Sequence, residues 1–261
     1  MVRISEYISK KNNNGEKVLS IFLTSGFPEK DNFPELALEI LNAGADMLEI
    51  GFPFSDPLAD GPTIQNSSQK ALDNGINIKS TINYVKKIRE KSDKPLILMG
   101  YANPVLSYGL VNFSNDAKSS GVNGLIIPDV PVNEYHNFFD GAFNGIEKIL
   151  LTTPTTSEER IKKIDELSEG FVYYVSMTGT TGKQVKHSDE ILNPLKKTYS
   201  LIKKNKMLIG FGISNPEDVK TFAPYCSGVI VGSAVIKSLM NDDMRSTLKL
   251  VSDLKEALIH N

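Results

Sequence analysis

Cysteine, histidine and tryptophan are scarce or absent in this chain of 261 residues. The lone cysteine, Cys226, excludes a disulfide within the chain. The three histidines, His136, His187 and His260, are too dispersed to make a Cys/His cluster with the spacing of metal ligands. We therefore expect no structural zinc and no metal in the functional site. The absence of tryptophan excludes nothing by itself.

The sequence also lacks an excess of charge of either sign. It has 29 Lys and Arg against 31 Asp and Glu, a net charge of −2, and no basic block of the kind that follows a nucleic-acid backbone. No apolar run is long enough to span a bilayer. The polar segment from Met1 to Lys17 lacks the apolar core of a secretory signal. We expect a cytoplasmic protein that binds neither nucleic acid nor a membrane.

The chain does contain short apolar runs that alternate with helical patterns from end to end. This alternation is typical of repeated βα units around a parallel sheet. Eight strands are predicted: Val18 to Thr24, Met47 to Ile50, Leu96 to Met99, Gly124 to Ile127, Lys148 to Leu151, Phe171 to Ser176, Met207 to Ile209 and Gly228 to Val231.

Eight strands in a chain of this length favour a closed sheet, because closure leaves no edge to protect. We predict an α/β fold, a single eightfold (β/α) TIM-barrel domain over residues 1–261 with an N-terminal helical extension. An open doubly wound sheet is the alternative, although no Gly-x-Gly-x-x-Gly follows the first strand. In a barrel, functional residues lie at the carboxyl ends of the strands and in the loops that follow.

Several helices show where they begin or which face they bury. Asn32 and Glu35 form a capping pair before an apolar stripe, and Gly44 follows the end of that helix. The segment 214–217, Ser-Asn-Pro-Glu, predicts another helix start, with Glu217 as the capping-box acid. The two apolar stripes are Phe33, Leu36, Ala37, Ile40 and Leu41, and Met244, Leu248, Val251, Leu254 and Leu258.

Two carboxylates near the end of the second strand are candidate catalytic groups. Glu49 lies within an apolar run, so its side chain either enters the sheet interior, where desolvation raises its pKa, or turns to solvent at the strand end. The loop that follows contains Asp56 and Asp60 among three prolines and two glycines, which can fix a side chain or hinge a lid. We interpret Asp56 as a loop-stabilising residue and Asp60 as a functional one.

Glycine-bearing turns after the last strands predict a phosphate site. Gly212 follows the seventh strand, Gly232 and Ser233 follow the eighth, and each turn leads into a helical pattern. Glycine lets backbone N–H groups approach an anion, and barrels often bind phosphate at these two loops. The turn that contains Gly182, after the sixth strand, can form a third side of the same cup.

Two aromatic side chains remain open between core packing and a role in the site. Phe22 on the first strand can line an apolar ligand pocket. Tyr173 and Tyr174 are adjacent on the sixth strand, so only one of them can face the barrel interior.

The segment from Leu48 to Gln65, LEIGFPFSDPLADGPTIQ, resembles the tryptophan synthase alpha chain family. The likeness continues along the chain in order: MGYANP at 99–104, PDVP at 128–131, SMTGTTG at 176–182, GFGIS at 210–214 and GSA at 232–234.

This resemblance implies a lyase that cleaves indole-3-glycerol phosphate to indole and glyceraldehyde 3-phosphate without a metal or cofactor of its own. Glu49 would be the general acid and base, and Asp60 would accept the indole N–H and stabilise the positive ring. By the same resemblance, Phe22 lines the indole pocket, Tyr173 is an active-site tyrosine, and the residues around the phosphate are Gly182, Gly212, Gly232 and Ser233.

The resemblance also implies a partner, the tryptophan synthase beta chain, whose pyridoxal phosphate condenses the released indole with serine. The two chains of the family form an alpha2beta2 heterotetramer. Two other functions remain open at this point. The chain could release free indole as a stand-alone lyase, or it could activate a beta chain without catalysis.

Overall fold

The computed structural model describes residues 2–176, 189–210, 212–241 and 243–259, and its centre is a sheet of nine parallel strands. The strand order is β5-β4-β3-β2-β1-β9-β8-β7-β6. The strands are β1 (Val18–Thr24), β2 (Met47–Gly51), β3 (Leu96–Met99), β4 (Gly124–Ile126), β5 (Glu147–Lys148), β6 (Leu150–Thr152), β7 (Phe171–Val175), β8 (Lys206–Gly210) and β9 (Gly228–Val231).

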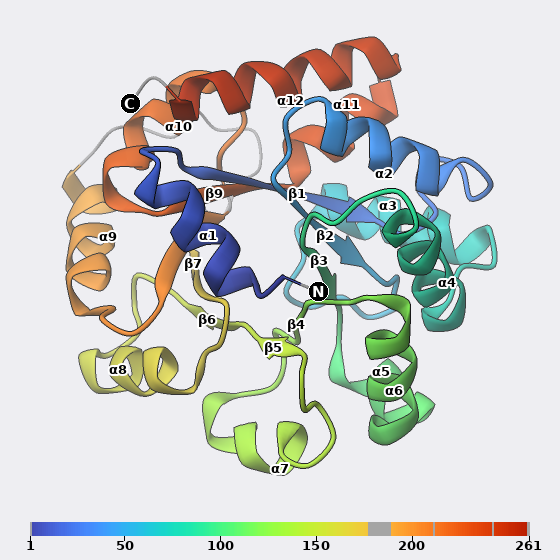
Figure 1. The fold of residues 1–261 in the computed structure, drawn as a ribbon, viewed down its shortest axis with the longest axis horizontal. Helices are drawn as coiled ribbons and strands as arrows, with labels where there is room; N and C mark the ends of the chain where they lie inside the picture. Colours follow the sequence, from blue (N-terminus) through green and yellow to red (C-terminus); the bar gives the residue numbers. More distant parts are fainter. Residues whose placement is uncertain (1, 177–188, 211, 242, 260–261) are drawn as a thin grey trace.

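Helices surround this sheet on its outer side (Figure 1). They are α1 (Ile4–Asn13), α2 (Phe33–Asn42), α3 (Pro62–Asp73), α4 (Ile78–Arg89), α5 (Ala102–Tyr108), α6 (Leu110–Ser120), α7 (Tyr135–Phe139), α8 (Glu158–Leu167), α9 (Asp189–Leu201), α10 (Pro216–Phe222), α11 (Ser233–Asn241) and α12 (Met244–Ile259). Of the helices described, none has the length and apolar character that a membrane span requires.

The sheet is a nearly closed barrel, because its two outermost strands follow each other in the chain. Only Ile149 separates β5 from β6, and its N–H still donates to Leu125 of β4 at 3.0 Å. From Leu150 onward the chain pairs with β7 instead. The single strand predicted at Lys148 to Leu151 is therefore wrong in detail. It is divided into β5, which pairs with β4, and β6, which pairs with β7. The predicted TIM barrel is confirmed.

Burial on both sides explains why the strands are nearly continuous apolar runs. All seven residues of β1 and all five of β2 are buried, since the barrel interior covers one face and the helices cover the other. Ser20 in β1 and Glu49 in β2 are the polar exceptions in the middle of these two strands. A buried polar side chain requires a partner, and these two residues bond to each other.

The two predicted helix starts are correct in position and wrong in their hydrogen bonds. At α2, Asn32 makes no side-chain cap and donates instead to Glu29. At α10 the cap is Asn215, which accepts from two backbone N–H groups of the first turn. The acid that reaches back is Asp218, which accepts from Ser214, rather than Glu217. Counting from Asn215 places Asp218 at the third helical position, but it accepts from Ser214, one residue before the cap, so the pair is not a capping box.

The buried stripe of α2 is confirmed in full, and Gly44 after it has a φ of +128°. In α12, Val251, Leu254 and Leu258 are fully buried. Leu248 is partly buried and Met244 is exposed, because the first turn of this helix extends past the core.

Helix α1 is the predicted N-terminal extension and lies across the barrel opening where the strands begin (Figure 1). The buried carboxylate of Glu147 accepts from the N–H of Ile4 at 2.5 Å and from the hydroxyl of Ser5 at 2.9 Å, so it caps the start of α1. At its other end, Lys11 lies 3.6 Å from the buried carboxylate of Asp46. This end of the barrel is therefore closed, and the open end is the one where the strands finish.

Candidate active site

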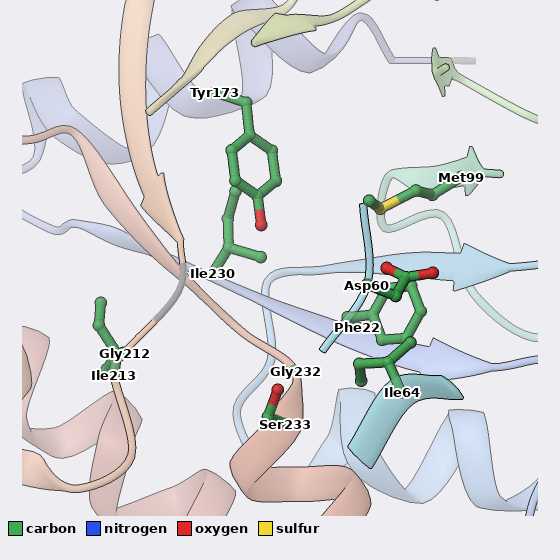
Figure 2. Close-up of a pocket in the computed structure, with 10 residues that line it drawn as sticks. All are labelled: Phe22, Asp60, Ile64, Met99, Tyr173, Gly212, Ile213, Ile230, Gly232 and Ser233. Atoms are coloured by element: carbon green, nitrogen blue, oxygen red, sulfur yellow. The ribbon is translucent and has the colours of Figure 1, made fainter. Parts of the chain in front are cut away.

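A cavity opens at the carboxyl ends of the strands, where a barrel predicts function. Its empty volume is about 480 Å³. The residues that line it come from β1, β3, β7 and β9, from three loops and from the first turns of α3 and α11 (Figure 2): Phe22, Asp60, Ile64, Met99, Tyr173, Gly212, Ile213, Ile230, Gly232 and Ser233. Six of the eight residues proposed from the sequence are in this set. Of the other two, Glu49 lies outside the lining, and Gly182 lies outside the described residues.

Asp60 stands in the loop between β2 and α3, and its carboxyl lines the cavity. The hydroxyl of Tyr101 donates to Oδ2 of Asp60 at 3.0 Å and accepts from the N–H of Ala59 at 3.0 Å. One side chain at the end of β3 therefore fixes both the loop backbone and the carboxylate. Burial raises the pKa of Asp60 to about 6, and the bond from Tyr101 opposes this rise. Asp60 is mainly ionised at neutral pH.

Glu49 points into the barrel interior, because it is in register with Phe22, whose ring lines the cavity. Its side chain is fully buried, and Oε1 accepts from the hydroxyl of Ser20 at 2.8 Å. Ser20 lies two residues before Phe22 on the same face of β1, which is one layer deeper in the barrel. The carboxyl is therefore turned below the cavity floor in this conformation.

The surroundings of Glu49 decide its protonation state. Burial raises the pKa of Glu49 to about 8, against a smaller lowering effect of the bond from Ser20. The second oxygen, Oε2, is buried without a hydrogen-bond partner. A buried carboxylate with one free oxygen is costly when charged, so Glu49 carries a proton at neutral pH. The sequence left its direction open, and the structure places it inside.

Tyr173 lies across the cavity from Asp60 (Figure 2). Its hydroxyl occupies space that a side chain at Gly210 would fill. Burial and the nearby carboxyls of Glu49 and Asp60 raise the pKa of Tyr173 well above its ordinary value, so the phenol is neutral. Tyr174 lies on the opposite face of β7, toward the helices, so the residue of this pair that faces the interior is Tyr173.

Gly212, Gly232 and Ser233 gather at one side of the cavity (Figure 2). Gly212 has a φ of +80°, a conformation that favours glycine. Ser233 is the first residue of α11, so the free N–H groups of a helix start face this side. The arrangement fits an anion bound by backbone N–H groups and the helix dipole. Asp56, by contrast, is exposed and accepts from its neighbour Ser55.

Sequence reasoning missed the apolar lining residues Ile64, Met99, Ile213 and Ile230 and two polar residues that support the carboxyl groups, Tyr101 and Ser20. Tyr101 lay in the quoted MGYANP segment, directly after a strand, where the barrel rule already predicted function. Ser20 was detectable as a lone hydroxyl in the apolar run from Val18 to Thr24, two positions before Phe22. Among the described residues, no group of three or more His, Cys, Asp or Glu side chains is placed to hold a metal ion.

Fold and site together define an α/β-barrel protein with two carboxyl groups of shifted pKa and a cluster of glycine-bearing loops whose arrangement fits an anion. The family model of the tryptophan synthase alpha chain matches residues 8–258. The chain belongs to the tryptophan synthase alpha chain family, and it is accordingly a lyase of tryptophan synthesis.

Relatives and solved structures of this family match nearly the whole length of the chain. The chain is 42% identical to the tryptophan synthase alpha chain of Flavobacterium psychrophilum over 249 residues, which cover 95% of this chain and 98% of that one. It is 41% identical to that of a Thermoanaerobacter species, with 99% and 100% covered. The structure of tryptophan synthase subunit alpha from Legionella pneumophila superposes with a TM-score of 0.89 at 33% identity and full coverage of both chains.

Proposed function

We propose that this chain cleaves indole-3-glycerol phosphate to indole and glyceraldehyde 3-phosphate in a retro-aldol reaction. The observation that carries the proposal is the different protonation state of two carboxyl groups, one at the cavity wall and one in the barrel interior beneath it. At neutral pH, Glu49 holds a proton and Asp60 is mainly ionised, because their pKa values are about 8 and about 6. One acid and one anion are what this reaction requires, and different surroundings commonly create such pairs in enzymes.

The substrate has an apolar ring and an anionic end, and the cavity has a matching region for each. Phe22, Met99 and Ile230 offer an apolar wall for the indole ring, and Gly232 and Ser233 offer N–H groups for the phosphate. With the ring nitrogen at Asp60, its N–H donates to the carboxylate. Tyr101 already occupies Oδ2, so Oδ1 is the oxygen free to accept.

Cleavage then needs one proton to enter and one to leave. Glu49 donates its proton to indole C3, and the ring takes a positive charge that the carboxylate of Asp60 stabilises. The Glu49 carboxylate next removes the proton of the glycerol hydroxyl beside the breaking bond. The electron pair of the C–C bond returns to the ring, which releases indole and an aldehyde, and Glu49 is again protonated. Glu49 must turn away from Ser20 toward the cavity for these transfers.

The chain's wider setting is part of the same proposal. We infer that it needs no metal or organic cofactor of its own and acts in the cytoplasm. Its partner is a beta chain with pyridoxal phosphate, in an alpha2beta2 assembly that passes indole from one site to the other. Family membership supports the beta-chain partner. The comparisons do not favour a stand-alone lyase or a non-catalytic activator.

The test is release of indole from indole-3-glycerol phosphate by the purified chain, with and without a beta chain. Glu49→Gln keeps the shape but cannot exchange a proton, so we expect a loss of about 100-fold to 10,000-fold in turnover. Asp60→Asn should retain most substrate binding and lose most turnover. Asp56→Asn, in the same loop but exposed, is the matched control and should leave the activity of the chain alone unchanged. Wild-type rates in Glu49→Gln would refute the assignment.

A further inference from the structure

A second cavity adjoins the first behind Asp60 and has no role in the reaction just described. Its empty volume is about 330 Å³. Four residues line both cavities, namely Phe22, Asp60, Ile64 and Met99. Figure 2 labels all four. The further walls of this side cavity are Thr24, Gly51, Phe52, Phe54, Ser68, Gly100, Tyr101 and Pro128.

Two glycines let aromatic rings pack closely against the backbone in the walls of the side cavity. A Cβ at Gly51 would lie 2.6 Å from the ring of Phe22, and a Cβ at Gly100 would overlap the ring of Phe52. Any other residue at these positions would force an aromatic ring to move. The rings of Phe22 and Phe52 therefore lie directly against the backbone and form close-packed walls of the side cavity.

The side cavity is apolar in spite of the hydroxyls in its walls. Thr24 is hydrogen-bonded to Ser67 at 2.6 Å, and Ser68 accepts from the N–H of Phe54 at 3.2 Å. The hydroxyl of Tyr101 is used by Asp60 and Ala59. With these groups occupied, the surfaces left for a ligand are mainly apolar: aromatic rings, Ile64, Met99 and Pro128, with the carboxylate of Asp60 at the boundary to the main cavity. Such a space favours a small apolar group.

The position of Asp60 relates this space to a particular atom of the substrate. The carboxylate stands between the two cavities, with Tyr101 bonded from the side-cavity wall. In the proposed complex the indole N–H donates to Asp60 from the main cavity. The benzo-ring carbon nearest that nitrogen is C7, so in this complex a substituent at C7 lies close to Asp60, where the two cavities meet.

We propose that the side cavity accepts a small apolar substituent at C7 of the indole ring, so that the enzyme takes 7-methyl-substituted substrates as well as the parent compound. This inference rests on the proposed function for the orientation of the ring. It adds a specificity that the reaction itself does not require.

The experiment measures binding of 3-(indol-3-yl)propyl phosphate, which lacks the reacting hydroxyls and cannot be cleaved. Titration calorimetry compares the parent with its 7-methyl, 7-ethyl and 5-ethyl derivatives. Burial of one methyl group in a fitting apolar space tightens binding up to about fourfold, whereas a methyl group that does not fit weakens it about tenfold or more. We expect the 7-methyl compound to bind between equally and fourfold more tightly than the parent.

A variant enlarges the side cavity to test the direction of the substituent. Phe54→Leu removes ring atoms from its wall and should tighten binding of the 7-ethyl compound at least fivefold, with no such gain for the 5-ethyl compound. Phe138→Leu is the matched control, because this buried ring in α7 lines neither cavity. It should change neither ratio.

The outcomes separate this inference from the proposed function. Weak or absent binding of the parent compound overturns both. Tight binding of the parent with a tenfold loss for the 7-methyl compound overturns the side-cavity proposal alone. Equal gains in affinity for the 5-ethyl and 7-ethyl compounds in Phe54→Leu also overturn it, because the larger cavity would then not distinguish a substituent at C7 from one at C5.

Discussion

Removal of one hydroxyl, in Tyr101→Phe, tests how the site holds Asp60 in its ionised form. The Tyr101 hydroxyl donates to Oδ2 of Asp60 at 3.0 Å. The Tyr101 ring packs against the ring of Phe54, with 5.4 Å between the two ring centroids. Phenylalanine keeps this packing and removes the bond. Burial of Asp60 then raises its pKa without the opposing effect of Tyr101.

The size of the effect follows from the strength of a hydrogen bond to a charged group. Such a bond contributes about 1.5–3 kcal/mol, which corresponds to about one to two pKa units. The pKa of Asp60, about 6 in the wild-type chain, should therefore rise to about 7 to 8. At pH 7 the ionised fraction falls from about nine-tenths to between about one-half and one-tenth.

The assay is the pH profile of kcat/KM for indole release, which reports the groups of the free enzyme. Asp60 must be ionised and Glu49 protonated, so the profile should be bell-shaped, with limbs that belong to the pair. In Tyr101→Phe the acid limb should move up by about one to two units, and activity should partly recover at higher pH. Tyr108→Phe removes a comparable bond to Asp116 outside the cavity and should not move either limb. A uniform loss with an unmoved acid limb would refute the reasoning.

Three further outcomes are expected. The pKa of Glu49 is about 8 in the folded chain against an ordinary 4.5, so folding favours its protonated form and wild-type stability falls as pH rises between these values. Glu49→Gln should therefore unfold at higher urea than wild type at pH 8 but not at pH 4.5, and parallel pH dependences would contradict this. Asn215→Ala removes the cap of α10 and should cost about 1 kcal/mol in urea unfolding. Gly232→Ala places a Cβ 3.2 Å from Cβ of Phe22 and should raise KM more than it lowers kcat.

The barrel was predictable because its strands are long enough apolar runs to be recognised one by one. The change of pairing partner at Ile149, from β4 to β7, was not predictable. Pairing partners depend on where the barrel closes and not on the apolar character of the local sequence. The cap of α10 was off by one residue for a local reason. Ser214 and Asn215 are both good caps in isolation, but Pro216 favours the first helical position and holds the residue before it extended, which makes Asn215 the cap.

The candidate site was predictable where the chain places function at strand ends. Asp60, Gly232 and Ser233 needed only the barrel rule and residue chemistry. Tyr101 was not assigned because a tyrosine after a strand has no distinctive pattern, and its role exists only through contact with a loop 41 residues earlier in the chain. The side cavity was beyond sequence reasoning, since its walls come from chain segments as far apart as Phe22 and Pro128.

The sequence left open whether Glu49 faces the barrel interior or solvent, and it could not say whether an interior carboxyl turns up to the cavity or down to Ser20. That choice depends on the layer below, where Ser20 offers the hydrogen bond that the carboxyl accepts at 2.8 Å. Turning upward breaks this bond, whose net contribution is about 0.5–1.5 kcal/mol when Glu49 is neutral. This cost is small beside that of a buried charge. The proton therefore keeps Glu49 free to move, and the reaction requires the same protonated form.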